Sequence, residues 1–415
     1  MRVQRTVPPA AAPFGMKAVL HGIAGLVRGP RSRRRREAEL REYFGVRHVF
    51  LVSSGKAALT LVLRALKRIA PEKSEVLIPA YTCFSVPAAI ARAGLKVALC
   101  DIDPSTFDFD YRHFGNAVND ATLCVVPSHL FGIPSDMDRI NDLCRRKGVF
   151  VIEDAAQAMG GTYRGKKLGT IGDAGFFSLG RGKNVTCGSG GILVTNSVRI
   201  AHALYAECAS LGEPGIREEL GAYCMLLLLG LFLHPLLYWL PAGLPFLRLG
   251  ETRYSGEFPV QRLSGMRAGV LAGWEERLEQ GNAERKGNTR LLSLYLQVDT
   301  SRGAPPLLRF PLLTGSDRAR EVLCVSSRER GLGISRMYPC PVNEISEIRE
   351  QFSGRTFPSA KKAAETLVTL PTHPLLSARD REALRGLLEE LFSARPPGLQ
   401  EKCGAMKGKD GGLHA

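Results

Sequence analysis

The sequence lacks any closely spaced pair of cysteines. Ten cysteines are spread over the 415 residues, and no two of them lie closer than 16 positions. Structural zinc sites usually take cysteines from spacings such as CxxC, so this distribution excludes that class of protein and predicts no metal site. Several of the cysteines, among them Cys100 and Cys124, stand in apolar runs and are expected to be small core residues in a reducing compartment.

The N-terminus lacks the apolar segment and the small-residue cleavage site of a secretory signal, which favours a cytoplasmic location. Acidic residues are also missing from positions 1–36, whose nine Lys and Arg supply +9 of the net charge of +16. This basic N-terminal arm favours an anionic partner, such as a membrane surface. No nucleic-acid-binding motif accompanies the arginines, so nucleic acid is not expected as a partner.

Charged side chains are absent from 28 consecutive positions, residues 220–247. This length exceeds the ~20 residues needed to span a bilayer. However, Pro235, Pro241 and Pro245 interrupt the run, which leaves an unbroken helix only to about residue 234. We therefore expect a helical hairpin or re-entrant element that dips into one leaflet. Burial in the core or in a dimer interface is the alternative.

Apolar residues (45%) and charged residues (23%) are present in the proportions of an ordinary globular protein with a sizeable core. Short Val/Ile/Leu runs alternate with helix-length segments from residue 48 to residue 194, which predicts an α/β domain on a mostly parallel sheet. A smaller C-terminal α+β domain should follow. The expected parts are the basic arm (1–36), a large domain (37–219), an apolar insertion (220–260), a helical connection with the small domain (261–395) and a flexible tail (396–415).

The densest group of reactive side chains lies between residues 151 and 196. The apolar strand VFVIED ends in Glu153 and Asp154, and in open α/β sheets the carboxyl ends of strands face the ligand crevice. The strand GFFS ends in Ser178 and leads into a glycine-rich turn with Lys183. Pyridoxal phosphate needs this arrangement, because the lysine forms a Schiff base, the acid keeps the ring nitrogen protonated, and hydroxyls and backbone amides hold the phosphate.

Taken together, the motifs resemble those of the DegT/DnrJ/EryC1/StrS aminotransferases, which are fold-type-I pyridoxal-phosphate enzymes acting mainly on nucleotide-linked keto-sugars. The resemblance covers nearly everything from about residue 37 to 395. It rests on VSSGKAAL (52–59), IPAYTCFSVPAAI (78–90), SHLFGIPSDMDRI (128–140), VIEDAAQAMGG (151–161), FFSLGRGKNVTCGSGG (176–191) and SRMYPCPV (335–342).

By position, the resemblance implies a role for each matching residue. Lys183 carries the cofactor and moves a proton between the substrate carbon and the cofactor. Asp154 pairs with the ring nitrogen, and Gln157 lies near the phenolic oxygen of the ring. Ser178 binds the phosphate. It is helped by the backbone N–H groups at the N-terminus of the helix that begins near SSGKAAL, at Gly55, Lys56 and Ala57.

Some positions depart from the pattern of the family. Cys83 stands where an aromatic ring commonly covers the cofactor, and Tyr81 or Phe84 could take that place. Lys56 replaces a usual phosphate-binding threonine, and its ammonium could contact the phosphate. Met337 replaces a frequent histidine on the substrate side. His129 is expected to be a packed or hydrogen-bonded residue rather than an acid or base.

The resemblance implies transamination of a keto group, with an amino acid such as glutamate as donor. The acceptor would be a nucleotide- or lipid-linked keto-sugar of cell-surface glycan biosynthesis. The enzyme would be a homodimer whose sites are completed by the partner chain. Two alternatives stay open, namely an aminotransferase for a non-sugar hydrophobic ketone and a non-catalytic membrane-associated family member.

Overall fold

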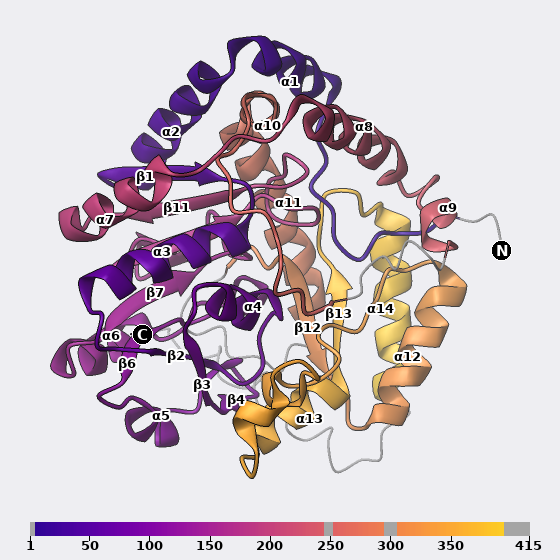
Figure 1. Ribbon diagram of the computed structural model, residues 1–415. Coiled ribbons are helices and arrows are strands. Elements are labelled where there is room, and N and C mark those ends of the chain that lie inside the picture. Colours follow the sequence, from indigo (N-terminus) through magenta and orange to yellow (C-terminus); the bar gives the residue numbers. More distant parts are fainter. Residues whose placement is uncertain (1–4, 245–251, 294–304, 394–415) are drawn as a thin grey trace, which may run out of the picture.

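The computed structural model describes residues 5–244, 252–293 and 305–393. A seven-stranded sheet forms the centre of the large domain, in the order β1–β11–β10–β7–β6–β2–β3 (Figure 1). Its strands are β1 (His48–Val52), β2 (Glu75–Pro79), β3 (Lys96–Cys100), β6 (Thr122–Val125), β7 (Phe150–Asp154), β10 (Ala174–Ser178) and β11 (Gly191–Thr195).

The sheet is mostly parallel, as the sequence predicts. Strands β10, β7, β6, β2 and β3 run parallel to one another, whereas β11 pairs antiparallel with both β1 and β10. The strands are almost wholly buried, which is why they appear in the sequence as continuous apolar runs. The α/β fold class is therefore confirmed.

The helices of the large domain follow the strands in the βα alternation that the sequence predicts. Helix α3 is apolar around most of its circumference and is buried between the sheet and α7, while α6 is amphipathic and begins at the capping side chain of Asp136. These helices are α3 (Gly55–Ile69), α4 (Ser85–Arg92), α5 (Tyr111–Ala117), α6 (Met137–Arg146) and α7 (Val198–Ala209). Two short hairpins complete this domain. The first pairs β4 (Ile102–Asp103) with β5 (Asp108–Phe109) between β3 and α5, and the second pairs β8 (Thr162–Tyr163) with β9 (Lys166–Lys167) between β7 and β10.

The basic N-terminal region is ordered on the surface of the protein. Helix α1 (Met16–Arg28) is amphipathic, and α2 (Pro30–Phe44) begins inside the basic arm and continues past its expected end at residue 36. Pro30 occupies the first turn of α2, where a missing N–H is tolerated, and the arginine run continues the helix. The run at 31–36 thus belongs to a packed helix, in which Arg33 and Arg36 are buried and Arg31, Arg34 and Arg35 are exposed.

The chain before α1 runs across to the small domain. The backbone N–H of Val7 donates to the Gly331 carbonyl (2.8 Å), and Nε2 of the buried His373 donates to the Pro8 carbonyl (2.7 Å). Arg5 adds an ion pair with Asp380 (2.6 Å). These contacts hold residues 5–15 in place although the segment has no regular secondary structure.

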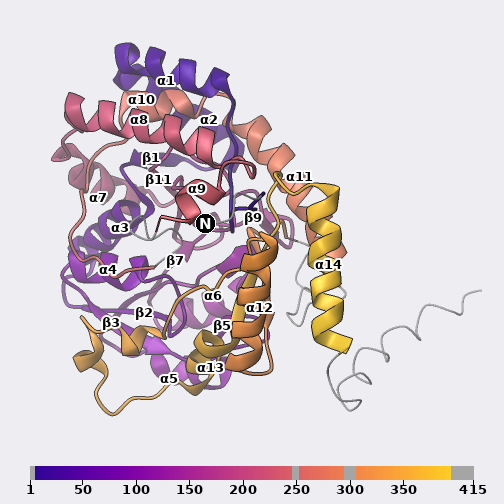
Figure 2. The ribbon, with the colours of Figure 1, turned by 90° about the vertical axis from the view of Figure 1, so that its right-hand side faces the viewer.

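The small domain is built on a two-stranded antiparallel sheet flanked by helices (Figures 1 and 2). The long helix α11 connects it to α10 and the large domain. The elements are α10 (Gly265–Val270), α11 (Trp274–Leu292), β12 (Arg309–Leu313), α12 (Asp317–Arg330), α13 (Pro358–Thr366), β13 (Leu367–Pro371) and α14 (Ala378–Ser393). The tail expected over 396–415 lies outside the described residues.

The uncharged run forms a surface helix rather than the hairpin or buried element expected from the sequence. Helix α8 (Ile216–Phe232) is followed after a break at Pro235 by the short α9 (Trp239–Ala242). Of the 17 residues of α8, the structure buries only Glu219 and Leu226, so the core alternative fails within the single chain. No helix in the described parts of the chain is long and apolar enough to cross a bilayer. Residues 245–247 of the run lie outside the described residues.

Candidate active site

Asp154 and Ser178 end neighbouring parallel strands and therefore lie at the same edge of the sheet. Asp154 pairs in register with Phe176, two residues before Ser178. The Asp154 carboxylate is buried, accepts one backbone hydrogen bond from Ala156 (3.0 Å), and forms no ion pair with any described residue. Burial raises the pKa of Asp154, and the nearby Lys183 only partly offsets this. A cation placed beside this carboxylate would remove the penalty.

Glu153, the preceding residue, differs from Asp154 because several donors within the protein hydrogen-bond to its carboxylate. Its carboxylate accepts hydrogen bonds from the backbone N–H groups of Gly169 (2.8 Å), Ile171 (2.5 Å) and Gly172 (2.7 Å). It also accepts one from Nε2 of the fully buried His129 (2.9 Å), whose Nδ1 accepts from Ser135. Glu153 and His129 therefore hold the loop after β9 in place, and His129 is a hydrogen-bonded structural residue.

Lys183 lies in the glycine-rich turn that follows β10. Burial lowers the pKa of its ammonium, while Cys83 and Asp154 oppose that shift and Arg309 adds to it. The turn is anchored at its base, where the Leu179 N–H donates to the Gly190 carbonyl (2.8 Å). An amine with a lowered pKa is more often neutral and nucleophilic near pH 7.

The N-terminus of α3 and Ser178 form a cradle for an anion. Ser54 caps the helix by accepting from the Ala57 N–H (3.1 Å), while the first N–H groups of any helix, here those of Gly55 and Lys56, have no partner within it. A Cβ at Gly55 would lie 3.1 Å from the Ser178 Cβ, a tight contact that would push the two residues apart, so glycine favours their close approach. The helix dipole adds a partial positive charge at the same point.

Lys56 brings a full positive charge to this cradle. Its ammonium lies 4.4 Å from the centroid of the Phe258 ring, and burial lowers its pKa while the neighbouring Cys83 raises it. The sequence suggests that Lys56 contacts a phosphate, and its position beside the start of α3 is compatible with that contact.

Gln157 spans the boundary between the two domains. Its Oε1 accepts from the Phe131 N–H (3.2 Å) and its Nε2 donates to the Tyr338 hydroxyl (3.0 Å). Tyr338 is buried and is the small-domain residue that closes this side of the site. Burial raises the pKa of its phenol well above the usual value, so the hydroxyl stays protonated.

In the loop after β2, some side chains pack on Tyr338 and one lies near the reactive lysine. Tyr81 and Phe84 pack on the Tyr338 ring, with centroids 5.5 and 6.2 Å away. Cys83 instead lies close enough to Lys56 and Lys183 to affect the pKa values of both. Of the three candidates for the residue over the cofactor, Cys83 thus lies within electrostatic range of Lys183.

Arg309 is a site residue that the sequence does not reveal. It begins β12, and one guanidinium nitrogen donates to the hydroxyls of Ser335 (3.1 Å) and Thr369 (3.4 Å). Burial lowers its pKa, with Tyr338 and Tyr238 opposing the shift, and it forms no ion pair with a described residue. In the sequence, Arg309 looks like an ordinary surface charge at the start of an apolar strand. No motif distinguishes it as a site residue.

Comparison with known proteins matches this arrangement to one family. The sequence profile of the DegT/DnrJ/EryC1/StrS aminotransferase family fits residues 16–225, which is just over half of the chain. The chain belongs to this family. The match includes β7, β10 and the Lys183 turn, and family membership confirms the resemblance inferred from the motifs.

One relative in the family is the GDP-perosamine synthase of Caulobacter vibrioides, which is 38% identical over 165 residues. The matched region covers 40% of this chain and 44% of that protein, so the chain spans less than half the length of this curated relative.

Solved structures support the fold along nearly the whole chain. DesV from S. venezuelae, determined in complex with a ketimine intermediate, is 25% identical with a TM-score of 0.72, and covers 94% of this chain and 100% of its own. The sugar aminotransferase Spr1654 from Streptococcus pneumoniae in its PLP form is 19% identical with the same TM-score, over 94% and 99% of the two chains.

The aminotransferases of this family use pyridoxal phosphate, and the residues of the site fit that group. Asp154 is a buried carboxylate without a cationic partner, which a protonated ring nitrogen would supply. Lys183 offers a buried amine, and the α3 cradle with Ser178 offers donors for a dianionic phosphate. The donor set thus matches the three polar ends of the cofactor.

Proposed function

We propose that the protein is a pyridoxal-phosphate-dependent aminotransferase that converts the keto group of a sugar to an amine. The observation that supports this proposal most is the state of Asp154. Its carboxylate is buried at the end of β7, near Lys183, and forms no ion pair with a described residue. A purely structural acid is expected to be satisfied as Glu153 is, by several backbone donors.

When bound, pyridoxal phosphate supplies an aldehyde that takes up an amino group and a cationic ring that withdraws electrons from the substrate carbon. Asp154 holds the proton on the ring nitrogen by its negative charge. Ser178 and the N-terminus of α3 bind the phosphate, and Lys56 adds a positive charge to this phosphate-binding site. Gln157 is fixed by Phe131 and Tyr338, so its position beside the ring is set before the group binds.

Lys183 holds and moves the proton. Its lowered pKa favours the neutral amine, which accepts a proton from the substrate carbon at Nζ and returns it on the other side of the exchange. The buried position keeps water from competing for that proton. Over a full cycle the donor loses its amino group and becomes a keto acid, and the acceptor ketone becomes an amine.

Arg309 binds a carboxylate in this scheme. Its guanidinium is buried, lacks an acidic partner among the described residues and lowers the pKa of Lys183, so it lies within electrostatic range of the reacting atoms. An α-amino acid such as glutamate brings a carboxylate next to the amine that reacts. Arginine suits that group because its planar fork can bind both oxygens.

A keto-sugar of cell-surface glycan biosynthesis, linked to a nucleotide or a lipid, is the proposed acceptor. Family membership and the GDP-perosamine synthase relative support a sugar. A hydrophobic ketone is the second candidate, because Met337 and most of the apolar insertion lie outside residues 16–225, which the family profile matches. A non-catalytic role is disfavoured by the intact Lys183 and Asp154.

The proposal also includes a homodimer, which rests on family membership, and a peripheral position at the cytoplasmic face of a membrane. The support for the latter is the exposed apolar surface of α8 next to the basic helices α1 and α2.

Spectroscopy of the purified full-length protein tests the function. Added pyridoxal phosphate should give a visible absorbance band, glutamate should convert it to the spectrum of the amine form, and a suitable keto-sugar nucleotide should restore it. Lys183→Ala should give neither conversion. If the wild-type protein binds no cofactor, or binds it without responding to any amino donor, the proposal is wrong.

A further inference from the structure

Helix α1 presents an apolar stripe to the outside of the protein. Met16, Leu20, Ile23 and Val27 are 69%, 58%, 48% and 88% exposed. Their spacing of four, three and four residues places them on one face of a helix. Large apolar side chains gathered on one exposed face usually mark a surface that something else covers.

The other face of α1 is fixed against the protein, so the stripe cannot turn inward. Gly22 and Gly25 lie against α10, where Gly265 and Gly269 face them. A Cβ at Gly25 would overlap the Gly265 carbonyl, which shows how closely the two backbones approach. This glycine contact holds α1 in one rotational setting.

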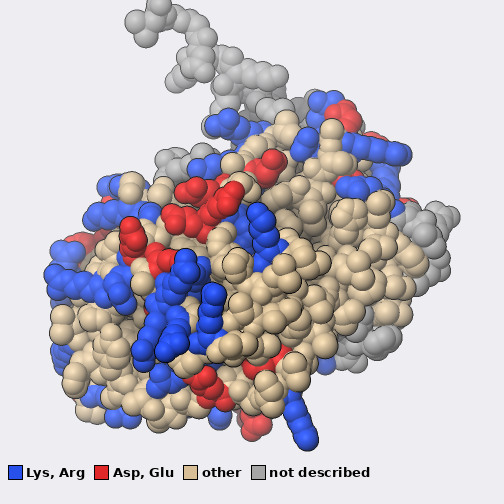
Figure 3. All heavy atoms as spheres, turned by 90° about the horizontal axis from the view of Figure 1, so that it is seen from above, with Lys and Arg blue, Asp and Glu red and all other residues tan. Residues whose placement is uncertain are grey.

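Helix α8 enlarges the apolar surface. The Tyr223 hydroxyl donates to the Val19 carbonyl of α1 (3.2 Å), so the two helices are neighbours, as Figure 2 also shows. The exposed apolar residues of α8 and the following turns are Ile216, Leu220, Met225, Leu227, Leu228, Leu231, Leu236, Leu237 and Leu240, each more than a third exposed. We call this surface of α1, α8 and α9 the apolar face. In Figure 3 a broad area free of charged side chains lies beside a group of Lys and Arg.

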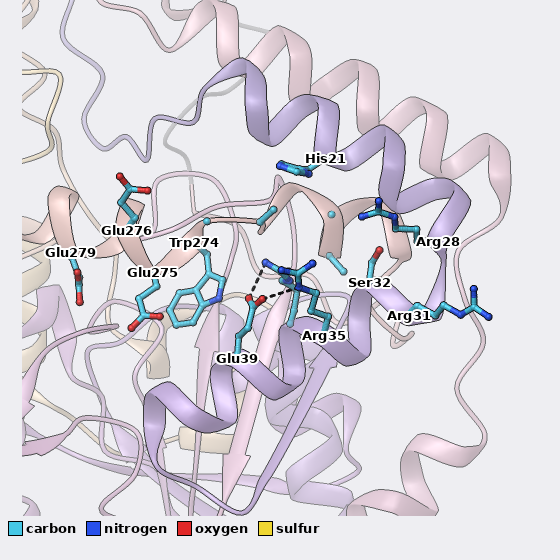
Figure 4. A pocket seen from close by; sticks show the side chains of 15 residues that line it. His21, Arg28, Arg31, Ser32, Arg35, Glu39, Trp274, Glu275, Glu276 and Glu279 are labelled. Atoms are coloured by element: carbon cyan, nitrogen blue, oxygen red, sulfur yellow. Dashed lines mark hydrogen bonds and ion pairs between the residues drawn. The ribbon is translucent and has the colours of Figure 1, made fainter.

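Arginines border the apolar face. Arg28, Arg31 and Arg34 are exposed and form no ion pair with a described residue. Arg28 and Arg31 also line one end of a groove of about 810 Å³ between α1, α2 and α11 (Figure 4). Glu275, Glu276 and Glu279 lie toward its other end, whereas Glu39 lies between the two ends and pairs with Arg35 and Arg36.

We propose that the apolar face docks on the surface of an anionic lipid membrane. Amphipathic helices bind membranes in this way, with apolar side chains in the acyl boundary and basic side chains at the headgroups. A second copy of the chain is the less suitable occupant. A two-fold contact would bring the same arginines of both copies toward each other, whereas interface cores are depleted of charge.

Docking would place the reactive loop directly behind the membrane-bound helix. Leu226, the buried leucine of α8, packs on Gly188 in the turn after Lys183. Tyr238, at the start of α9, lies near enough to Arg309 to affect its pKa. The active site would therefore open close to the membrane, where a lipid-linked acceptor would be present. This last step rests on the proposed aminotransferase function, whereas the docking itself does not.

Vesicle flotation of the full-length protein tests the docking. The wild-type protein should float with vesicles of phosphatidylcholine and phosphatidylglycerol in equal parts, and binding should fall at high salt and with phosphatidylcholine alone. The double variants Ile23→Gln/Val27→Gln and Leu228→Gln/Leu231→Gln should each lose most of the floated fraction. Val322→Gln/Val325→Gln, which changes two exposed valines of α12, should float like the wild type.

Charge variants separate the two parts of the contact. Arg28→Gln/Arg31→Gln/Arg34→Gln should remove the preference for phosphatidylglycerol, whereas Arg92→Gln/Lys96→Gln/Arg145→Gln, elsewhere on the surface, should keep it. Circular dichroism establishes that each variant is folded. A wild-type protein that stays unfloated with both vesicle types overturns the proposal. So do α8 variants that float normally but change from dimer to monomer, because the face would then join two copies. These readouts do not depend on cofactor binding, so the docking and the enzymatic function can fail separately.

Discussion

The side-chain amide of Gln157 donates a hydrogen bond to the hydroxyl of Tyr338, over 3.0 Å and across 181 positions of sequence. It joins the large domain to the small domain beside the reactive lysine. Because both groups are buried, the bond forms in a region where a lost partner is costly.

This bond should be measurable by a double-mutant cycle. Tyr338→Phe leaves the Gln157 amide without its acceptor and should lower the free energy of unfolding by about 1–3 kcal/mol. Gln157→Leu should cost a similar amount, and the double variant should cost less than the sum, with a coupling of about 1 kcal/mol. Urea unfolding of the cofactor-free protein gives all three values. Additive costs would show that the two side chains do not interact.

Asp154 and Glu153 are adjacent carboxylates, and we expect removal of their charges to change the stability of the protein in opposite directions. The folded-state pKa of Asp154 is raised above its unfolded value, so the folded apoprotein takes up a proton more readily than the unfolded chain, and stability falls as the pH rises past the ordinary Asp range. Asp154→Asn should therefore make the apoprotein more stable than the wild type at neutral pH, with a difference that vanishes in acid. The same variant should bind the cofactor and lose most activity.

Glu153→Gln is the matched comparison. It removes the charge that three backbone N–H groups share, and should cost at least about 2 kcal/mol of stability at pH 7. Thermal unfolding across pH for both variants checks the pair. An Asp154→Asn protein with normal turnover, or a Glu153→Gln protein as stable as the wild type, would reverse the assigned roles.

His373 should make the packing of the N-terminal segment sensitive to pH. Burial lowers its pKa from 6.5 to about 4, and its neutral ring donates to the Pro8 carbonyl. The folded state thus binds this proton less readily than the unfolded chain. The contribution of neutral His373 to the free energy of unfolding is therefore complete above pH 6.5 and is lost as the pH falls toward 4. The loss should reach about 3 kcal/mol. His373→Gln should flatten this part of the stability profile, whereas the exposed His202→Gln should not.

The role of Arg309 can be tested by measuring which of the two substrates binds more weakly when the arginine is replaced. Arg309→Met should raise the KM for the amino donor roughly thirtyfold or more, as expected when one partner of a buried charge pair is removed. Arg309→Lys should recover part of the loss, and Arg336→Met, an exposed arginine near Tyr338, should have little effect. If the KM for the acceptor rises instead, Arg309 binds an acidic group on the sugar. No change in either KM would remove it from the site.

The sequence predicts the parts of this structure that rest on local pattern. Buried strands such as β7 and β10 appear as apolar runs with polar ends, so Asp154, Ser178 and Lys183 can be grouped into one site from the sequence alone. The motif already contains the glycine at position 55, and the structure adds a geometric reason for it, because a Cβ there would make a tight contact with Ser178.

Contacts between distant segments cannot be predicted in this way. Arg309 reaches the site only because β12 pairs with β13 and places it by Ser335 and Thr369. The docking of residues 5–15 depends on backbone groups and on the Arg5–Asp380 ion pair, whose partners lie 375 positions apart, so no local pattern reveals it. For the apolar run, the composition does not indicate which residues are buried, because only the fold shows that Leu226 is the one buried leucine of α8.

Mapping of the covalently fixed cofactor tests the central assignment most directly. The protein, loaded with pyridoxal phosphate and reduced with borohydride, should yield one modified peptide, with the pyridoxyl group on Nζ of Lys183. Lys183→Ala should give no adduct and should lower turnover about a thousandfold or more, because it removes the group that moves the proton. An adduct on Lys56, Lys166 or Lys167 instead, or no adduct on the wild-type protein, would contradict the account.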